Sequence, residues 1–122
     1  MVKKYENEAV TLMRSNNVAV LSTLSKKYDN FPFGSLITYI TGQDRSIYIY
    51  ASDIAEHTKN ILKNSKSCIT IFKIRENEDK QNSSRLSIMG DFKKIRNEKD
   101  IENCKDRFFK FLPDSKTYSS MH

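Results

Sequence analysis

The chain has 122 residues, of which 38% are hydrophobic and 30% charged, and its formal net charge is +6. This length suits one domain over residues 1–122, because single cores usually hold roughly 100–200 residues. The composition is that of a globular chain and excludes a disordered one. No apolar run approaches the roughly 20 residues that a transmembrane helix needs, and no signal peptide follows Met1. These features predict a cytoplasmic protein with no membrane partner.

The surplus positive charge lies in the second half of the chain. Residues 61–122 carry 14 basic and 9 acidic side chains, against 7 and 6 in residues 1–60. A basic balance favours anionic partners such as nucleic acid, a phosphorylated cofactor or an acidic metabolite. Acidic residues interrupt the basic ones, as in RNEKD at residues 96–100, so we expect no nucleic-acid partner. The two cysteines, Cys68 and Cys104, match no metal spacing and predict no disulfide framework.

The first half of the chain reads as one helix followed by three strands. Apolar residues at helical spacing predict an amphipathic helix over residues 5–15, inside an N-terminal helical segment at 1–15. Short apolar or β-branched runs predict strands over 18–25, 33–41 and 46–51. We expect the last two strands to form a hairpin around Gly42.

The second half begins with a change from strand to helical period. Asp53 and Glu56 have the spacing of a capping box, which predicts a short helix over residues 54–63. Strands are predicted over 67–74 and 85–95, and we expect a bulge or a close backbone approach at Gly90. A last helix is predicted over 101–112, inside a C-terminal helical segment at 98–112.

This order of elements is not the regular alternation of strand and helix that builds a parallel sheet. Mostly consecutive strands with short links predict an antiparallel sheet, and about five such strands tend to curl into a barrel. We therefore expect a mainly β protein with flanking helices, of the α+β class.

Motifs for chemistry are few. Three glycines cannot build a nucleotide-cradling loop, and no His, Cys and carboxylate cluster has metal-ligand spacing, so no metal site or catalytic residue is predicted. One polar cluster remains, in residues 34–38 and 51–60. There the Thr58 hydroxyl and the His57 imidazole could hold a phosphate. The alternative is structural, with His57 on the surface and Thr58 facing the core.

Three motifs in order carry a family resemblance: FGSLITY at residues 33–39, SDIAEHTKNIL at 52–62 and RLSIMG at 85–90. Together they resemble the pyridoxamine 5′-phosphate oxidase-like, FMN-binding split-barrel proteins, and within them the branch of heme-utilisation, heme-degrading proteins. The resemblance spans roughly residues 16–113. It implies a split β-barrel that dimerises, with FMN at the interface between two subunits.

The resemblance also implies which residues would hold FMN. The residues so implied are Ser35, Leu36, Ile37 and Thr38 against the flavin, Ala51 and Ser52 at the ribityl-phosphate arm, His57 and Thr58 at the phosphate, and Arg85 near the ring system from the partner subunit. The pyridoxamine oxidases have an Arg-Lys pair where this chain has His57 and Thr58. We therefore expect phosphate binding to be weaker and more dependent on pH.

Relatives of this type continue past the last helix into at least one more strand, whereas this sequence ends at His122. The expected barrel is therefore either incomplete in its last strand or closed by a partner. Three functions stay open: an FMN-binding protein with flavin-dependent oxidoreductase activity, a heme-binding or heme-degrading protein with His57 and Met89 as candidate ligands, and a flavin-free dimeric scaffold. Whether the chain is an enzyme, and on which substrate, is not decided by the sequence.

Overall fold

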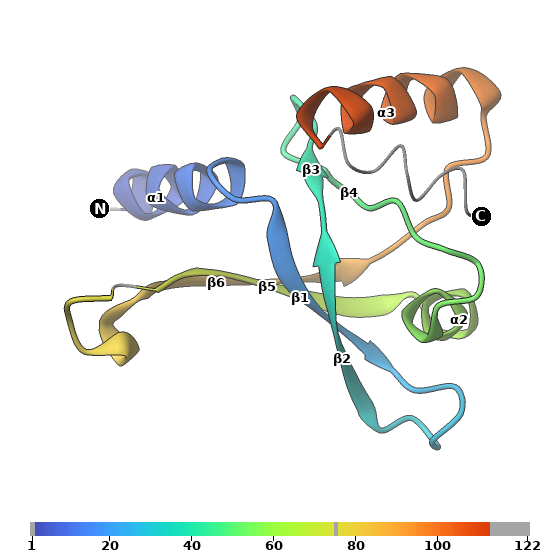
Figure 1. Cartoon of the computed structure of the whole chain (residues 1–122), viewed down its shortest axis with the longest axis horizontal. Helices are drawn as coiled ribbons and strands as arrows, with labels where there is room; N and C mark the ends of the chain where they lie inside the picture. Colours follow the sequence, from blue (N-terminus) through green and yellow to red (C-terminus); the bar gives the residue numbers. More distant parts are fainter. Residues whose placement is uncertain (1, 75, 113–122) are drawn as a thin grey trace.

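The fold is an antiparallel sheet flanked by three helices, in a computed structural model that describes residues 2–74 and 76–112 (Figure 1). It confirms the expected α+β class. The elements in chain order are α1 (Val2–Arg14), β1 (Val18–Leu24), β2 (Pro32–Thr38), β3 (Ile40–Thr41), β4 (Ile47–Tyr48), α2 (Glu56–Lys63), β5 (Lys66–Lys73), the short 3-10 helix η1 (Lys80–Asn82), β6 (Ser84–Asp91) and α3 (Glu98–Phe111).

The main sheet has four strands in the order β2-β1-β5-β6, and every neighbouring pair is antiparallel. Its strands alternate between a buried and a more exposed face, as period-two sequences do. The buried face packs against α1 and the segment around β3, which removes apolar surface from water and holds the layers together. The core residues are Met13, Ala19, Leu21, Ile37, Tyr39, Ile69 and Ile71.

The predicted strand over residues 33–41 is two strands, because the chain leaves the main sheet at Tyr39. This side chain is fully buried, its backbone N–H donates to the Asn17 carbonyl (2.9 Å), and its hydroxyl donates to the Met13 carbonyl (2.7 Å). Burial raises the pKa of Tyr39 to about 12. The anchored tyrosine turns the chain from β2 into β3, which pairs with β4 in a separate two-stranded sheet.

The predicted strand over residues 46–51 is also shorter, since only Ile47–Tyr48 pairs with β3. The residues after Tyr48 run toward α3, where the centroid of the Tyr50 ring lies 6.0 Å from that of the Phe108 ring. The expected hairpin around Gly42 is confirmed. A Cβ at Gly42 would lie 2.8 Å from the Tyr48 ring, so only glycine fits this close approach.

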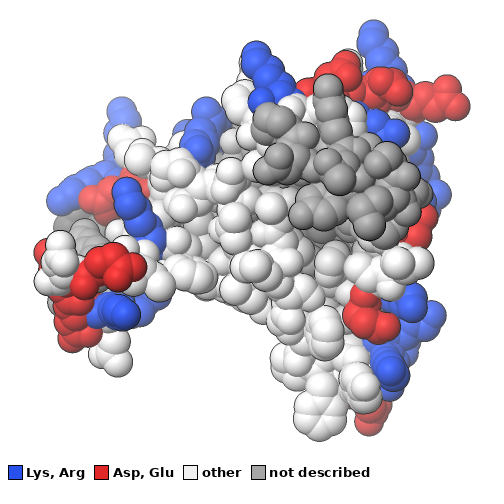
Figure 2. All heavy atoms as spheres, in the orientation of Figure 1, with Lys and Arg blue, Asp and Glu red and all other residues white. Residues whose placement is uncertain are grey.

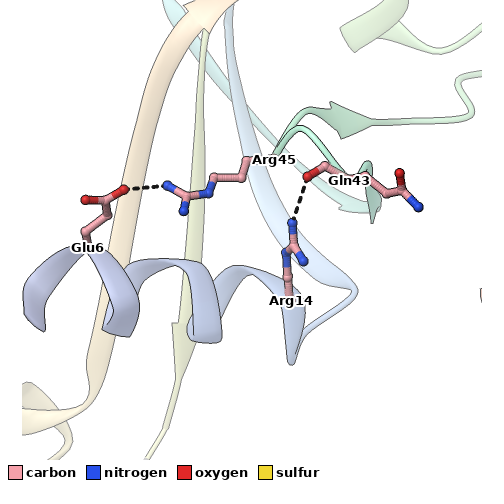
Figure 3. Close-up of polar contacts among 4 residues, drawn as sticks. All are labelled: Glu6, Arg14, Gln43 and Arg45. Carbon is pink, nitrogen blue, oxygen red and sulfur yellow. Dashed lines mark hydrogen bonds and ion pairs between the residues drawn. The ribbon is translucent and has the colours of Figure 1, made fainter. Parts of the chain in front are cut away.

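Polar contacts join this hairpin to α1 (Figure 3). Arg45 forms an ion pair with Glu6 at 2.6 Å, and Arg14 donates to the Gln43 carbonyl at 3.2 Å. Both contacts reach the turn between β3 and β4 from one face of α1. The helix is thereby fixed to the second sheet as well as to the first.

Two predictions for the second half are wrong. Gly90 pairs regularly with Ser67, and no atom lies within 4 Å of a Cβ placed on it, so there is neither a bulge nor a close approach. β6 ends at Asp91 rather than at residue 95, where the chain turns away after a last bond from the Phe92 N–H to the Ser65 carbonyl. None of the helices in the described part of the chain is long and apolar enough to span a membrane.

Candidate functional site

The position of α2 is set by Asn60, a fully buried polar side chain. Its Oδ1 accepts a bond from the Lys26 backbone N–H (2.8 Å), and its Nδ2 donates to the Thr23 hydroxyl (3.0 Å). Thr23 in turn donates to the Phe33 carbonyl of β2 at 3.5 Å. One side chain therefore ties α2 to the end of β1 and, through Thr23, to the start of β2. Sequence reasoning missed this role of Asn60. The available signal was a polar amide between apolar positions of the predicted helix.

The capping box predicted for the start of α2 from Asp53 and Glu56 is wrong. The helix begins at Glu56, the residue before it is Ala55, and no side chain caps it. Asp53 lies before the helix, in a turn where the Ile54 N–H donates to the Ser52 hydroxyl (3.3 Å). The first helical bond runs from the Lys59 N–H to the Ala55 carbonyl. The N–H groups of residues 56–58 thus form an uncapped positive helix end.

Thr58 and His57 lie in this first turn. The Thr58 hydroxyl oxygen is buried and has no hydrogen-bond partner among the described residues. A buried hydroxyl without a partner costs about 1–3 kcal/mol, so such an atom is unusual in a folded protein. His57 is half-buried, and burial lowers the pKa of its imidazole below the ordinary value. Burial thus favours the neutral imidazole, which can donate one N–H bond.

Charges at the start of α2 are nearly balanced. Glu56, in the first turn, forms an ion pair with Lys59 at 3.7 Å. Both side chains are about half exposed, so this pair contributes little to stability. The local preference for an anion therefore comes from backbone N–H groups and the Thr58 hydroxyl, and not from a fixed cation.

β2 contacts α2 and forms one edge of the main sheet. Its four predicted site residues do not share a face. Ile37 is in the core and Ser35 lies on the same side, whereas Leu36 is 76% exposed and Thr38 is exposed on the other side. Because strand side chains alternate, a ligand on the exposed side would meet Leu36 and Thr38 directly and the others only through their backbone.

Ala51 and Ser52 lie in the link between β4 and α2 and are half-buried. Ser52 also accepts a backbone bond from Ala55 N–H (3.2 Å), which places the link directly before the uncapped helix end. These residues precede His57 and Thr58 by a few positions along the chain.

Arg85 lies far from the other predicted residues within one chain. It pairs with Phe72 near the end of β5, whereas α2 leads into the start of β5 at Lys66. At about 3.3 Å per residue, the two ends are roughly 20 Å apart. Figure 1 shows the same separation, with α2 and the loop joining β5 to β6 at opposite ends of the sheet. Arg85 can join the site only if a second copy brings it there.

The chain matches the family described as CREG, beta-barrel over residues 2–122. It belongs to this family. The assignment confirms the resemblance to split-barrel proteins, and the known structures similar to this CREG beta-barrel chain support the same fold. One is titled a heme binding protein from Mycobacterium smegmatis, with a TM-score of 0.79 and 24% identity, covering 91% of this chain and 44% of that one.

Two further relatives carry heme in their names. HutZ, titled the heme storage protein from Vibrio cholerae, has a TM-score of 0.71 and 14% identity, covering 92% of this chain and 76% of that one. The chloroplastic non-canonical heme oxygenase HOZ of Arabidopsis thaliana is 33% identical over 84 residues, 69% of this chain and 25% of HOZ. This CREG beta-barrel chain thus spans a quarter of the plant protein and less than half of the mycobacterial one.

Proposed function

We propose that this CREG beta-barrel protein binds FMN, with the phosphate at the start of α2. The carrying observation is the buried Thr58 hydroxyl without a partner, beside a helix end that no side chain caps. A phosphate supplies the acceptor oxygens that both features lack. The residues present therefore fit a phosphorylated ligand even though the Arg-Lys pair of the pyridoxamine oxidases is absent.

In this proposal the other site residues are assigned to parts of FMN relative to its phosphate at the start of α2. Thr58 donates its hydroxyl to the phosphate and His57 an imidazole N–H, while Ala51 and Ser52 line the ribityl arm. Leu36 and Thr38 contact the flavin from the exposed side of β2, with Ser35 and Ile37 contributing backbone groups only. Bound FMN would supply the redox chemistry of a flavin-dependent oxidoreductase, and the chain supplies orientation and electrostatics.

The protein acts as a homodimer in this proposal. The face of the main sheet opposite the core carries exposed apolar side chains on all four strands, with Leu36 76% and Met89 83% exposed. In Figure 2 the middle of the visible surface, over β1 and β2, carries few charged side chains, which gather at its left, upper and right margins. A second copy would cover the apolar face and bring its Arg85 to the flavin.

An FMN titration of the purified protein tests the proposal, with Thr58→Val as the variant. We expect about tenfold weaker FMN binding, because a hydrogen bond to a charged group is lost. The same change should stabilise the FMN-free protein by about 1 kcal/mol, because it removes an unsatisfied buried hydroxyl. A merely structural threonine would not produce these opposite effects.

The matched control is Thr11→Val, a threonine at an exposed position of α1. It should change neither FMN affinity nor stability beyond about 0.5 kcal/mol. Wild-type protein whose melting temperature does not respond to excess FMN would contradict the proposal and favour a flavin-free dimeric scaffold. An unchanged FMN affinity in Thr58→Val would show that the FMN phosphate does not bind at the start of α2.

Heme handling is the second candidate, favoured by the names of the relatives. Its candidate iron ligands are His57, half-buried in α2, and Met89, exposed on β6. Hemin added to the protein should then give a Soret band that shifts in His57→Ala. A band unaffected by His57→Ala and by Met89→Leu would exclude both ligands.

A further inference from the structure

A small cavity lies between the β3–β4 hairpin and the β5–β6 part of the main sheet. Its volume is about 140 Å³. It opens on the side of the sheet that faces the hairpin, near the start of β5 and the end of β6. The FMN proposal uses the start of α2 and the exposed side of β2, and β2 is at the other edge of the sheet from β6. The cavity is therefore a separate feature.

The floor of the cavity is formed by a glycine. Gly90 pairs with Ser67 in the β5–β6 ladder, and both residues line the cavity. No atom lies within 4 Å of a Cβ placed on Gly90. Glycine in a strand interior lowers the stability of the strand, so a larger residue here would be the better choice for the strand alone. The missing side chain leaves space for another molecule.

The walls of the cavity are apolar. Ile47 on β4, Ile69 on β5, Ile88 on β6 and Phe92 line it, and all four belong to the hydrophobic core or pack against it. The volume is below the roughly 300–1,000 Å³ of sites for drug-sized ligands. It is close to the roughly 150 Å³ of an apolar cavity that holds benzene. Size and walls therefore select an apolar body of about six heavy atoms.

Arg45, in the turn between β3 and β4, adds hydrogen-bond donors to the lining. Its φ is 69°, a left-handed conformation that is uncommon for arginine. Its Nη1 pairs with Glu6 at 2.6 Å, which fixes the side chain between the hairpin and α1 (Figure 3). Among the described residues Glu6 is the only partner of this side chain, so other N–H groups of the guanidinium can bind a ligand.

The polar groups at the cavity also limit the charge of the ligand. Glu6 already balances the charge of Arg45. The Ser67 hydroxyl donates to the Ser65 carbonyl at 3.2 Å and has no further proton to donate. A ligand oxygen can therefore accept a bond from Arg45 without carrying a full negative charge.

We propose that this cavity binds a small, apolar, uncharged molecule with one acceptor oxygen, such as a cyclic ketone. Its apolar body lies over Gly90 between the isoleucines, and its oxygen accepts a bond from the Arg45 guanidinium. Burial of the body is favourable because the walls exclude water, and the bond to a charged donor is stronger than one between neutral groups. The inference goes beyond the proposed function, since it needs neither FMN nor a second copy of the chain.

Cyclohexanone and methylenecyclohexane test the inference, because they have nearly the same shape and only the ketone has an acceptor oxygen. Binding is followed by NMR of the isoleucine methyl groups during a titration. We expect cyclohexanone to shift the methyl signals of Ile47, Ile69 and Ile88, which line the cavity. It should bind wild type about tenfold more tightly than the hydrocarbon does.

Gly90→Val fills the cavity, and Ser87→Val is its control because Ser87 is on the same strand and faces the opposite side of the sheet. Valine suits a strand, so both variants should melt at or above the wild-type temperature. Only Gly90→Val should bind both ligands at least about tenfold more weakly. This stability readout separates a filled cavity from a misfolded protein.

Arg45→Met removes the donors, and its control Glu6→Gln removes the other partner of the same ion pair. Arg45→Met should bind the ketone and the hydrocarbon equally, whereas Glu6→Gln should keep the preference for the ketone. Absence of isoleucine shifts, equal binding of the two ligands by wild type, or unchanged binding in Gly90→Val would overturn the inference. An equal loss of binding in Ser87→Val would overturn it as well.

Discussion

Replacing Asn60 with alanine tests how α2 is held in place. The change removes two hydrogen bonds, from the Lys26 N–H at 2.8 Å and to the Thr23 hydroxyl at 3.0 Å. Each bond contributes about 1 kcal/mol net to the free energy of unfolding. Leaving the partly buried Lys26 N–H without an acceptor costs about 1 kcal/mol more. We therefore expect the free energy of unfolding to fall by about 3 kcal/mol. In a domain of this size the melting temperature should fall by about 10 °C.

Urea unfolding followed by circular dichroism measures this change, since the chain contains no tryptophan. Asn103→Ala, at an exposed position of α3, is the control for helix propensity and should change stability by less than about 0.5 kcal/mol. In a double-mutant cycle, Thr23→Val and Asn60→Ala should couple by about 1 kcal/mol. A loss below 1 kcal/mol for Asn60→Ala, or strict additivity in the cycle, would refute the reasoning that this amide positions α2.

Three further changes have defined outcomes. Tyr39→Phe removes the bond to the Met13 carbonyl and should lower the unfolding free energy by about 1 kcal/mol, measured in urea; no change would show that water replaces the bond. Because burial lowers the pKa of His57 in the fold, stability should fall as pH drops below about 6.5, and His57→Gln should flatten that dependence between pH 7.5 and 5.5; parallel curves would contradict it. Glu56→Gln should tighten FMN binding about threefold at low salt and not at high salt, because the change removes a negative charge from the first turn of α2; weaker binding would contradict this electrostatic account.

Periodicity predicted the fold well wherever one face of an element is buried. The helices and the strands of the main sheet lie within a few residues of their predicted ranges, because alternation and helical spacing report burial directly. The break at Tyr39 was missed since its cause is a long-range bond to the end of α1. The capping box failed for a similar reason: the Ser52 turn, and not Asp53, precedes the helix.

Less of the candidate site could be predicted from the sequence. Motif order put β2 and α2 together, and these two elements are in contact. Strand alternation alone puts Ser35 and Ile37 on the other face of β2 from Leu36 and Thr38, but sequence could not show which of the two pairs faces the core. The unsatisfied hydroxyl of Thr58 depends on packing alone. The distance of Arg85 from α2 follows from strand register, which no local pattern encodes.

The most direct test of the central claim is FMN binding after subunit mixing. In a shared site, Thr58→Val weakens the half on α2 and Arg85→Gln weakens the half from the second copy, so each homodimer alone binds FMN weakly. Mixed dimers contain one site with both changes and one with neither. We predict that mixing the two variants restores wild-type affinity in half of the sites of each mixed dimer. Affinity that stays at the level of the separate variants, in dimers shown to exchange subunits, would contradict a flavin site built from two copies of this chain.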